Sequence, residues 1–102
     1  MIESGAGIHQ ILVAASPGDA ITNLAFALRD LLRRIGPSEI YARHIEPSLH
    51  ENVYALHRYE SRADPRNLLM FHASIGQSDL HNFLIARPEP LVLVYHLSLI
   101  HI

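Results

Sequence analysis

The chain has 102 residues, of which 49% are hydrophobic and 18% charged, a composition that indicates one small globular domain rather than a disordered segment. Its net charge of −2 provides no basic field for nucleic acid, and the absence of cysteine excludes disulfides, thiolate nucleophiles and cysteine-based zinc sites. No apolar run approaches the roughly 20 residues of a membrane helix, and the amino-terminal MIESGAG lacks the positive charge of a signal peptide, so we expect a soluble cytoplasmic protein.

Residues 8–36 have the pattern of a strand, a tight turn and a helix, preceded by a lead-in of seven residues that we expect to be mobile. The buried strand is expected over 10–15, the turn over 16–19, and a helix of about four and a half turns after it. Asp19 is placed to cap the start of the helix, and Gly36, in a left-handed conformation before Pro37, to end it. The helix carries apolar residues at i, i+3, i+4, i+7 spacing, on one face: Ile21, Leu24, Ala25, Leu28, Leu31, Leu32 and Ile35.

Three further strands are predicted downstream, over 39–45, 67–73 and 91–95. Between them, residues 48–66 fit either a turn or two of helix or a short extended piece, followed by a polar loop over 58–66. A second helix is expected to begin near Ser78. The strands show little polar alternation, as is typical of strands covered on both faces. This order predicts an α/β fold: an open parallel sheet of about four strands, truncated, with two to three helices on both faces and right-handed crossovers.

The last predicted strand is too apolar to be left uncovered, yet only a few residues follow it. The final hexapeptide, LSLIHI, resembles the peptide obtained when sequencing-adapter DNA is translated. We therefore expect residues 1–96 to be a partial domain and residues 97–102 a non-native tail. The alternative is a genuine small domain with a long edge strand, which would be prone to associate.

The loops that follow the predicted strands are the candidate binding region, because ligands bind beyond the carboxyl ends of the strands in an open parallel sheet. Gly18 would let the main chain approach a phosphate at the helix amino terminus, although Asp19 competes with an anion for the same amides. His72 and His96 could bind sugar hydroxyls or act as an acid or base, because histidine titrates near neutrality. The alternative is that each bonds to a nearby carbonyl; His44 fits such a structural role better.

Two other chemistries have weaker signals. The run HASIG, with Ser74 at its centre, resembles the hydrolase nucleophile elbow G-x-S-x-G, except that His72 replaces the first glycine. A hydrolase with Ser74 as nucleophile is therefore a third hypothesis. No two histidines have the i, i+4 spacing of a helical zinc site, so we expect no metal.

Residues 9–96 resemble the amino-terminal portion of a family 4 glycosyltransferase of the GT-B type. The most specific pieces of the resemblance are SPGDAI at 16–21, FHASIG at 71–76 and YH at 95–96. The resemblance implies a Rossmann-like, acceptor-side domain that faces a second, donor-binding domain across a cleft. It also implies sugar transfer from a nucleotide-sugar donor, usually with retention of configuration and without a tightly bound metal or cofactor.

The resemblance also implies roles for single residues. Gly18 and Asp19 would lie near the donor phosphates, with Gly18 contacting phosphate and Asp19 substrate, and His96 would be the catalytic residue near the transferred sugar. We assign His72 and Ser74 to substrate binding. After the Tyr-His pair, members of this family continue with a polar residue and soon a proline, whereas Leu97 follows His96 here.

The donor-binding domain of such enzymes is absent from these 102 residues, so we expect the parent protein to be a glycosyltransferase and this chain to be inactive alone. Its partners would be a nucleotide-sugar donor, an unknown acceptor and the carboxy-terminal domain of the same chain, with no nucleic acid. Peripheral membrane association is left open. The main alternative is a stand-alone flavodoxin-like binding or interaction domain without catalysis.

Overall fold

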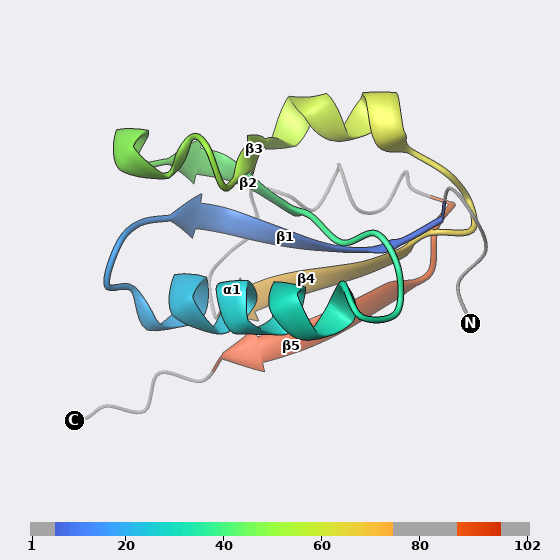
Figure 1. Cartoon of the computed structure of the whole chain (residues 1–102), viewed down its shortest axis with the longest axis horizontal. Helices are drawn as coiled ribbons and strands as arrows, with labels where there is room; N and C mark the ends of the chain where they lie inside the picture. The colour runs from blue at the N-terminus through green and yellow to red at the C-terminus, as the bar shows by residue number, and fades with distance from the viewer. Residues whose placement is uncertain (1–5, 75–87, 97–102) are drawn as a thin grey trace.

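The computed structural model describes residues 6–74 and 88–96 and contains one parallel β-sheet with an α-helix packed against it (Figure 1). The strands are β1 (Ile8–Ala15), β2 (Ile40–Ile45), β3 (Tyr54–Ala55), β4 (Leu68–Ser74) and β5 (Leu91–His96). Their order in the sheet is β3-β2-β1-β4-β5, and every neighbouring pair is parallel. The predicted α/β class with an open parallel sheet is confirmed. The described part contains five strands rather than about four, because Tyr54–Ala55 pairs with β2.

Within residues 6–74 and 88–96, one α-helix and two short 3₁₀ segments lie between the strands. Helix α1 (Ala20–Leu32) joins β1 to β2, while η1 (Pro47–Leu49) follows β2 and η2 (Leu56–Arg62) follows β3. The helix expected from Ser78 lies outside the described residues. Within the described ranges, no helical segment has the length and apolarity needed to span a bilayer.

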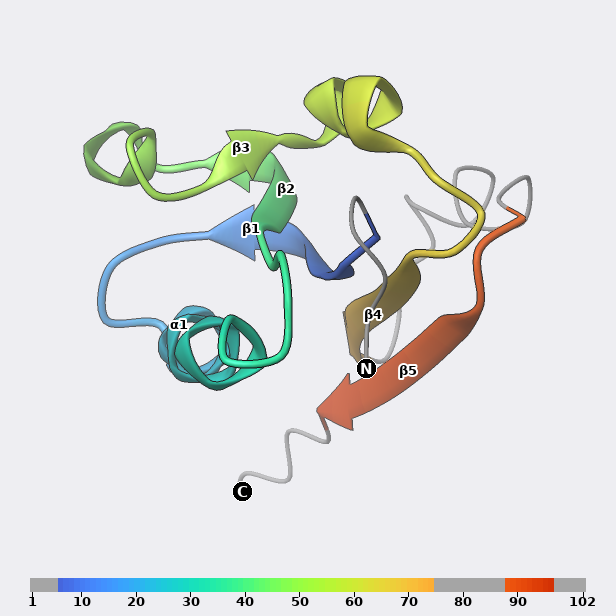
Figure 2. The same ribbon diagram turned by 45° about the vertical axis from the view of Figure 1, so that its right-hand side comes forward.

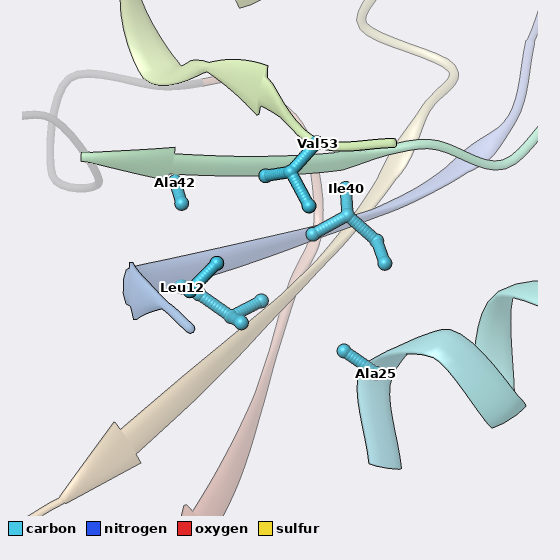
Figure 3. Packing of buried hydrophobic residues seen from close by; sticks show 6 residues of the cluster. Leu12, Ala25, Ile40, Ala42 and Val53 are labelled. Carbon is cyan, nitrogen blue, oxygen red and sulfur yellow. The ribbon is translucent and has the colours of Figure 1, made fainter. Parts of the chain in front are cut away.

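Helix α1 and segment η2 cover opposite faces of the sheet (Figure 2). Successive residues of a strand point to opposite faces, so β1 and β2 each supply both cores. On the α1 face, Ala25 packs with Val53 and with four residues of β1 and β2 (Figure 3). These are Leu12, Ala15, Ile40 and Ala42. On the η2 face, Tyr59 packs with Ile11, Tyr41, Leu69 and Phe71. Burial on both faces explains why the sequences of β1 and β2 show little alternation.

The start of α1 is as predicted, but its end is not. Asp19 Oδ2 accepts hydrogen bonds from the Thr22 amide at 2.9 Å and the Thr22 hydroxyl at 3.0 Å, which confirms the predicted cap. The helix ends at Leu32, and i→i+3 bonds of Arg34 and Ile35 tighten the chain after it. Among the described glycines only Gly18 has a positive φ, so the left-handed conformation predicted for Gly36 is wrong.

The predicted apolar stripe of α1 is only partly the face that packs on the sheet. Thr22 and Ala25 are buried, whereas Leu24, Leu31 and Ile35 are 41%, 54% and 53% exposed. The small Thr22 and Ala25 side chains allow the helix to lie close to the sheet, and the Gln10 side-chain amide of β1 donates to the Ala25 carbonyl at 2.8 Å. Close packing of small residues, rather than of the leucines, therefore sets the rotation of the helix.

A buried polar network joins the amino-terminal ends of the strands. The Gly7 amide donates to Asn67 Oδ1 at 2.8 Å, Asn67 Nδ2 donates to the Tyr59 hydroxyl at 3.0 Å, and that hydroxyl donates to Glu89 Oε2 at 2.6 Å. Two expectations are corrected by these contacts. Ala6 and Gly7 are buried rather than part of a mobile lead-in, and the expected polar loop over 58–66 begins inside η2, with Tyr59 fully buried.

The turn before β4 contains a carboxylate with a strongly lowered pKa. Asp64 Oδ1 accepts from the Arg66 Nε at 3.1 Å and from the Arg66 amide at 2.9 Å, and Oδ2 accepts from Nη2 at 2.9 Å. The side-chain hydrogen bonds first, and then the main-chain one, lower the pKa of Asp64 to about 2, from an ordinary value of 3.8.

Because folding lowers this pKa, the interaction stabilises the fold fully above about pH 4, and the stabilisation is lost as the pH falls through about 2. We expect an NMR titration of the Asp64 carboxyl to give a midpoint near 2 in the wild-type chain. Arg66→Ala should move the midpoint toward 3.8, whereas Arg58→Ala should leave it unchanged. A wild-type midpoint near 3.8 would contradict this assignment.

Candidate functional site

The carboxyl ends of β1, β4 and β5 lie at one edge of the sheet, where their arrowheads point the same way in Figure 1. β4 lies between the other two strands, with Ile11 opposite Phe71 and Ser74 opposite His96 in the register. Because β1 and β4 are parallel and aligned at Ile11 and Phe71, the residues that follow in both strands run to the same edge. We call this edge the carboxyl rim. It brings together the loop after β1 and the ends of β4 and β5, as expected from the order of the elements.

The loop after β1 is a tight turn that depends on Gly18. The Asp19 amide donates to the Ser16 carbonyl at 3.3 Å, Pro17 precedes Gly18, and Gly18 has a φ of +77°. This combination is typical of a type II turn, in which the third position requires glycine. A side-chain carbon at Gly18 would have no atom within 4 Å, so the backbone conformation and not lack of space requires glycine here. The turn is exposed, and its main chain is accessible at the carboxyl rim.

The Asp19 carboxylate already occupies the start of α1. By accepting from the Thr22 amide, it uses one of the free amides that a bound anion would need. Its negative charge also opposes an anion at the same place. The first turn of α1 by itself is therefore poorly suited to hold a phosphate beside Gly18.

His72 lies inside the fold rather than open at the rim. Its side chain is buried, and its Nε2 lies 2.6 Å from Gln10 Oε1. The Gln10 amide nitrogen donates to the Ala25 carbonyl, so the amide oxygen faces the imidazole and Nε2 must carry the hydrogen. A chain of hydrogen bonds thus connects the α1 main chain, through Gln10, to His72 in β4. Sequence reasoning missed Gln10, and a polar residue inside an otherwise apolar strand was the one signal that could have revealed it.

Ser74 and His96 are the last residues of β4 and β5, and they are paired directly across the sheet. Their main chains therefore meet at the carboxyl rim. His44 lies near the end of β2, exposed and opposite Ala14 of β1. Within residues 6–74 and 88–96, no three histidine or carboxylate side chains come together in an arrangement that could hold a metal ion.

No family model, curated protein or solved structure matches this chain. The class of the molecule is therefore defined by the fold alone: a small α/β domain with an all-parallel sheet, consistent with half of a Rossmann-like fold. Any function has to be argued from the residues that this topology brings to the carboxyl rim.

Proposed function

We propose that this chain is the acceptor-side part of a GT-B type glycosyltransferase, which transfers a sugar from a nucleotide-sugar donor to an acceptor. One observation carries the proposal. The parallel strands β1, β4 and β5 are neighbours, so the Gly18 turn and the main chains of Ser74 and His96 share the carboxyl rim. Ligands of open parallel sheets bind at such an edge, and SPGDAI at 16–21, FHAS at 71–74 and YH at 95–96 all lie there or lead to it.

In this proposal the residues of the carboxyl rim have separate roles. His96 is the catalytic residue beside the transferred sugar, the exposed Gly18 turn approaches the donor phosphates, and Ser74 and Asp19 contact substrate. His72 is buried and bonded to Gln10, so its contribution to substrate binding would act through the position of the end of β4.

The nucleotide itself would be held by a second domain across the cleft. The charge of Asp19 supports this division, because the first turn of α1 is poorly suited to hold a diphosphate without positive charge from elsewhere. We accordingly propose that these residues alone are inactive, that no metal or cofactor is tightly bound, and that the complete enzyme acts in the cytoplasm.

The test begins with the genomic DNA that follows codon 96. We expect a polar residue and a proline, then a few hundred further codons. The encoded full-length protein should consume a nucleotide sugar, and His96→Ala should lower its rate of transfer by about 100-fold or more, the usual range for loss of an acid or base. His50→Ala replaces an exposed histidine just after η1 to which no role is assigned; it is the matched control and should retain activity.

Two results would contradict the proposal. The first is a natural stop at this point together with a monodisperse chain that unfolds cooperatively, which would support a stand-alone binding domain. The second is covalent labelling by a serine-directed phosphonate that is lost in Ser74→Ala, which would support a hydrolase.

A further inference from the structure

A groove on the η2 face of the sheet lies apart from the residues assigned to the carboxyl rim. It has a volume of about 430 Å³, within the range of roughly 300–1,000 Å³ that is usual for small-molecule sites. It is lined by Arg43 of β2, by the apolar Ala55 and Leu56 where β3 passes into η2, and by His57 and Glu60 of η2. Arg43 is two residues beyond the buried Tyr41 and therefore faces the same side of the sheet.

Arg43 and His57 are the polar groups in this groove that are available to a ligand. Both are exposed, and neither forms a hydrogen bond or an ion pair within the part of the chain that the structure describes. Glu60, by contrast, already takes part in an interaction. Four other arginines are engaged with an ion pair, a carbonyl or an aromatic ring: Arg33 with Glu39, Arg66 with Asp64, Arg29 with the Asn52 carbonyl and Arg58 with Tyr54.

We propose that this groove binds a small organic anion with an apolar body. A carboxylate or phosphate group pairs with Arg43, whose planar guanidinium can donate two parallel hydrogen bonds to either group. His57 contributes a further donor, and the apolar body covers Ala55 and Leu56. The proposal does not depend on sugar transfer, because the site lies on β2, β3 and η2 and uses none of the rim residues.

The test is an NMR titration of the ¹⁵N-labelled chain with benzoate, with phenyl phosphate and with benzamide, the uncharged counterpart of benzoate. We expect saturable shifts of the Ala55, Leu56 and His57 amides with the two anions, and affinity at least about tenfold weaker for benzamide. Tighter binding of phenyl phosphate would identify a phosphate ligand, and tighter binding of benzoate a carboxylate. Equal binding of benzamide, or shifts that do not saturate, would overturn the proposal.

Variants separate the site from general surface charge. Arg43→Gln should weaken binding of the better anion by about tenfold or more, whereas Arg34→Gln removes the same charge from an exposed position after α1 and should have no effect. Glu60→Gln should strengthen binding about twofold or more, because it removes a negative charge from the groove.

His57→Ala provides an independent test should Arg43→Gln fail to fold, and we expect about threefold weaker binding. Equal effects of Arg43→Gln and Arg34→Gln, or no effect of His57→Ala, would show that the groove is not an anion site.

Discussion

Gly7→Ala is expected to lower the free energy of unfolding by about 3 kcal/mol, at the upper end of the usual cost of overpacking a core. A side-chain carbon at Gly7 would lie 2.4 Å from the Pro37 carbonyl oxygen and 3.0 Å from His9 Nε2. Pro37 cannot move away freely, because its carbonyl accepts from the Ile8 amide at 3.0 Å. Gly7 is itself held by bonds to Asn67 and Leu68, so the clash falls on the junction of β1, β2 and β4.

Gly18→Ala is the control for Gly7→Ala, since it also adds one methyl group to a glycine. Gly18 has a positive φ but open space around it, so the cost there is backbone strain alone, about 1 kcal/mol. Urea denaturation should give a lower free energy of unfolding for Gly7→Ala than for Gly18→Ala. The melting temperature of Gly7→Ala should lie roughly 10 °C or more below that of wild type. Equal stabilities of the two variants would contradict the role assigned to Gly7.

The sheet could be predicted because its signals are local. Four stretches with little polar alternation indicated strands of a parallel sheet, and Asp19 before an amphipathic stretch indicated where a helix begins. The order of strands and helix then fixed the common edge at which Gly18, Ser74 and His96 stand. A two-residue strand such as β3 is too short to leave such a pattern, and its pairing with Tyr41 and Ala42 of β2 is a contact between separate segments.

The features that were missed depend on contacts between distant parts of the chain. Burial of Gly7 follows from its approach to Pro37, 30 positions away, and burial of Tyr59 from hydrogen bonds to Asn67 and Glu89. The rotation of α1 follows from the packing of Thr22 and Ala25 against the sheet, where Gln10 of β1 donates to the Ala25 carbonyl. A helical pattern alone could not distinguish the stripe that faces the sheet from the one that carries Leu24, Leu31 and Ile35.

Loss of the hydrogen bond between Gln10 and His72 is also expected to have a large effect on the free energy of unfolding. Gln10 is fully buried, donates to the Ala25 carbonyl and accepts from His72 Nε2. Gln10→Leu keeps much of the volume but removes both bonds, and it leaves a buried imidazole N–H without this acceptor. Since a buried polar group that loses its partner costs about 1–3 kcal/mol, we expect Gln10→Leu to lower the free energy of unfolding by about 3 kcal/mol.

A double-mutant cycle shows whether this loss belongs to the bond with His72. Once His72 is also leucine, no imidazole is left without its acceptor, so Gln10→Leu should cost about 1–2 kcal/mol less in the His72→Leu background than in wild type. His44→Leu is the control, because His44 is an exposed residue on β2 beyond reach of Gln10; its effect should add to that of Gln10→Leu within about 0.5 kcal/mol. If the two cycles give the same coupling, the hydrogen bond does not hold His72 in place, and the end of β4 must be positioned by its pairing with β1 and β5 alone.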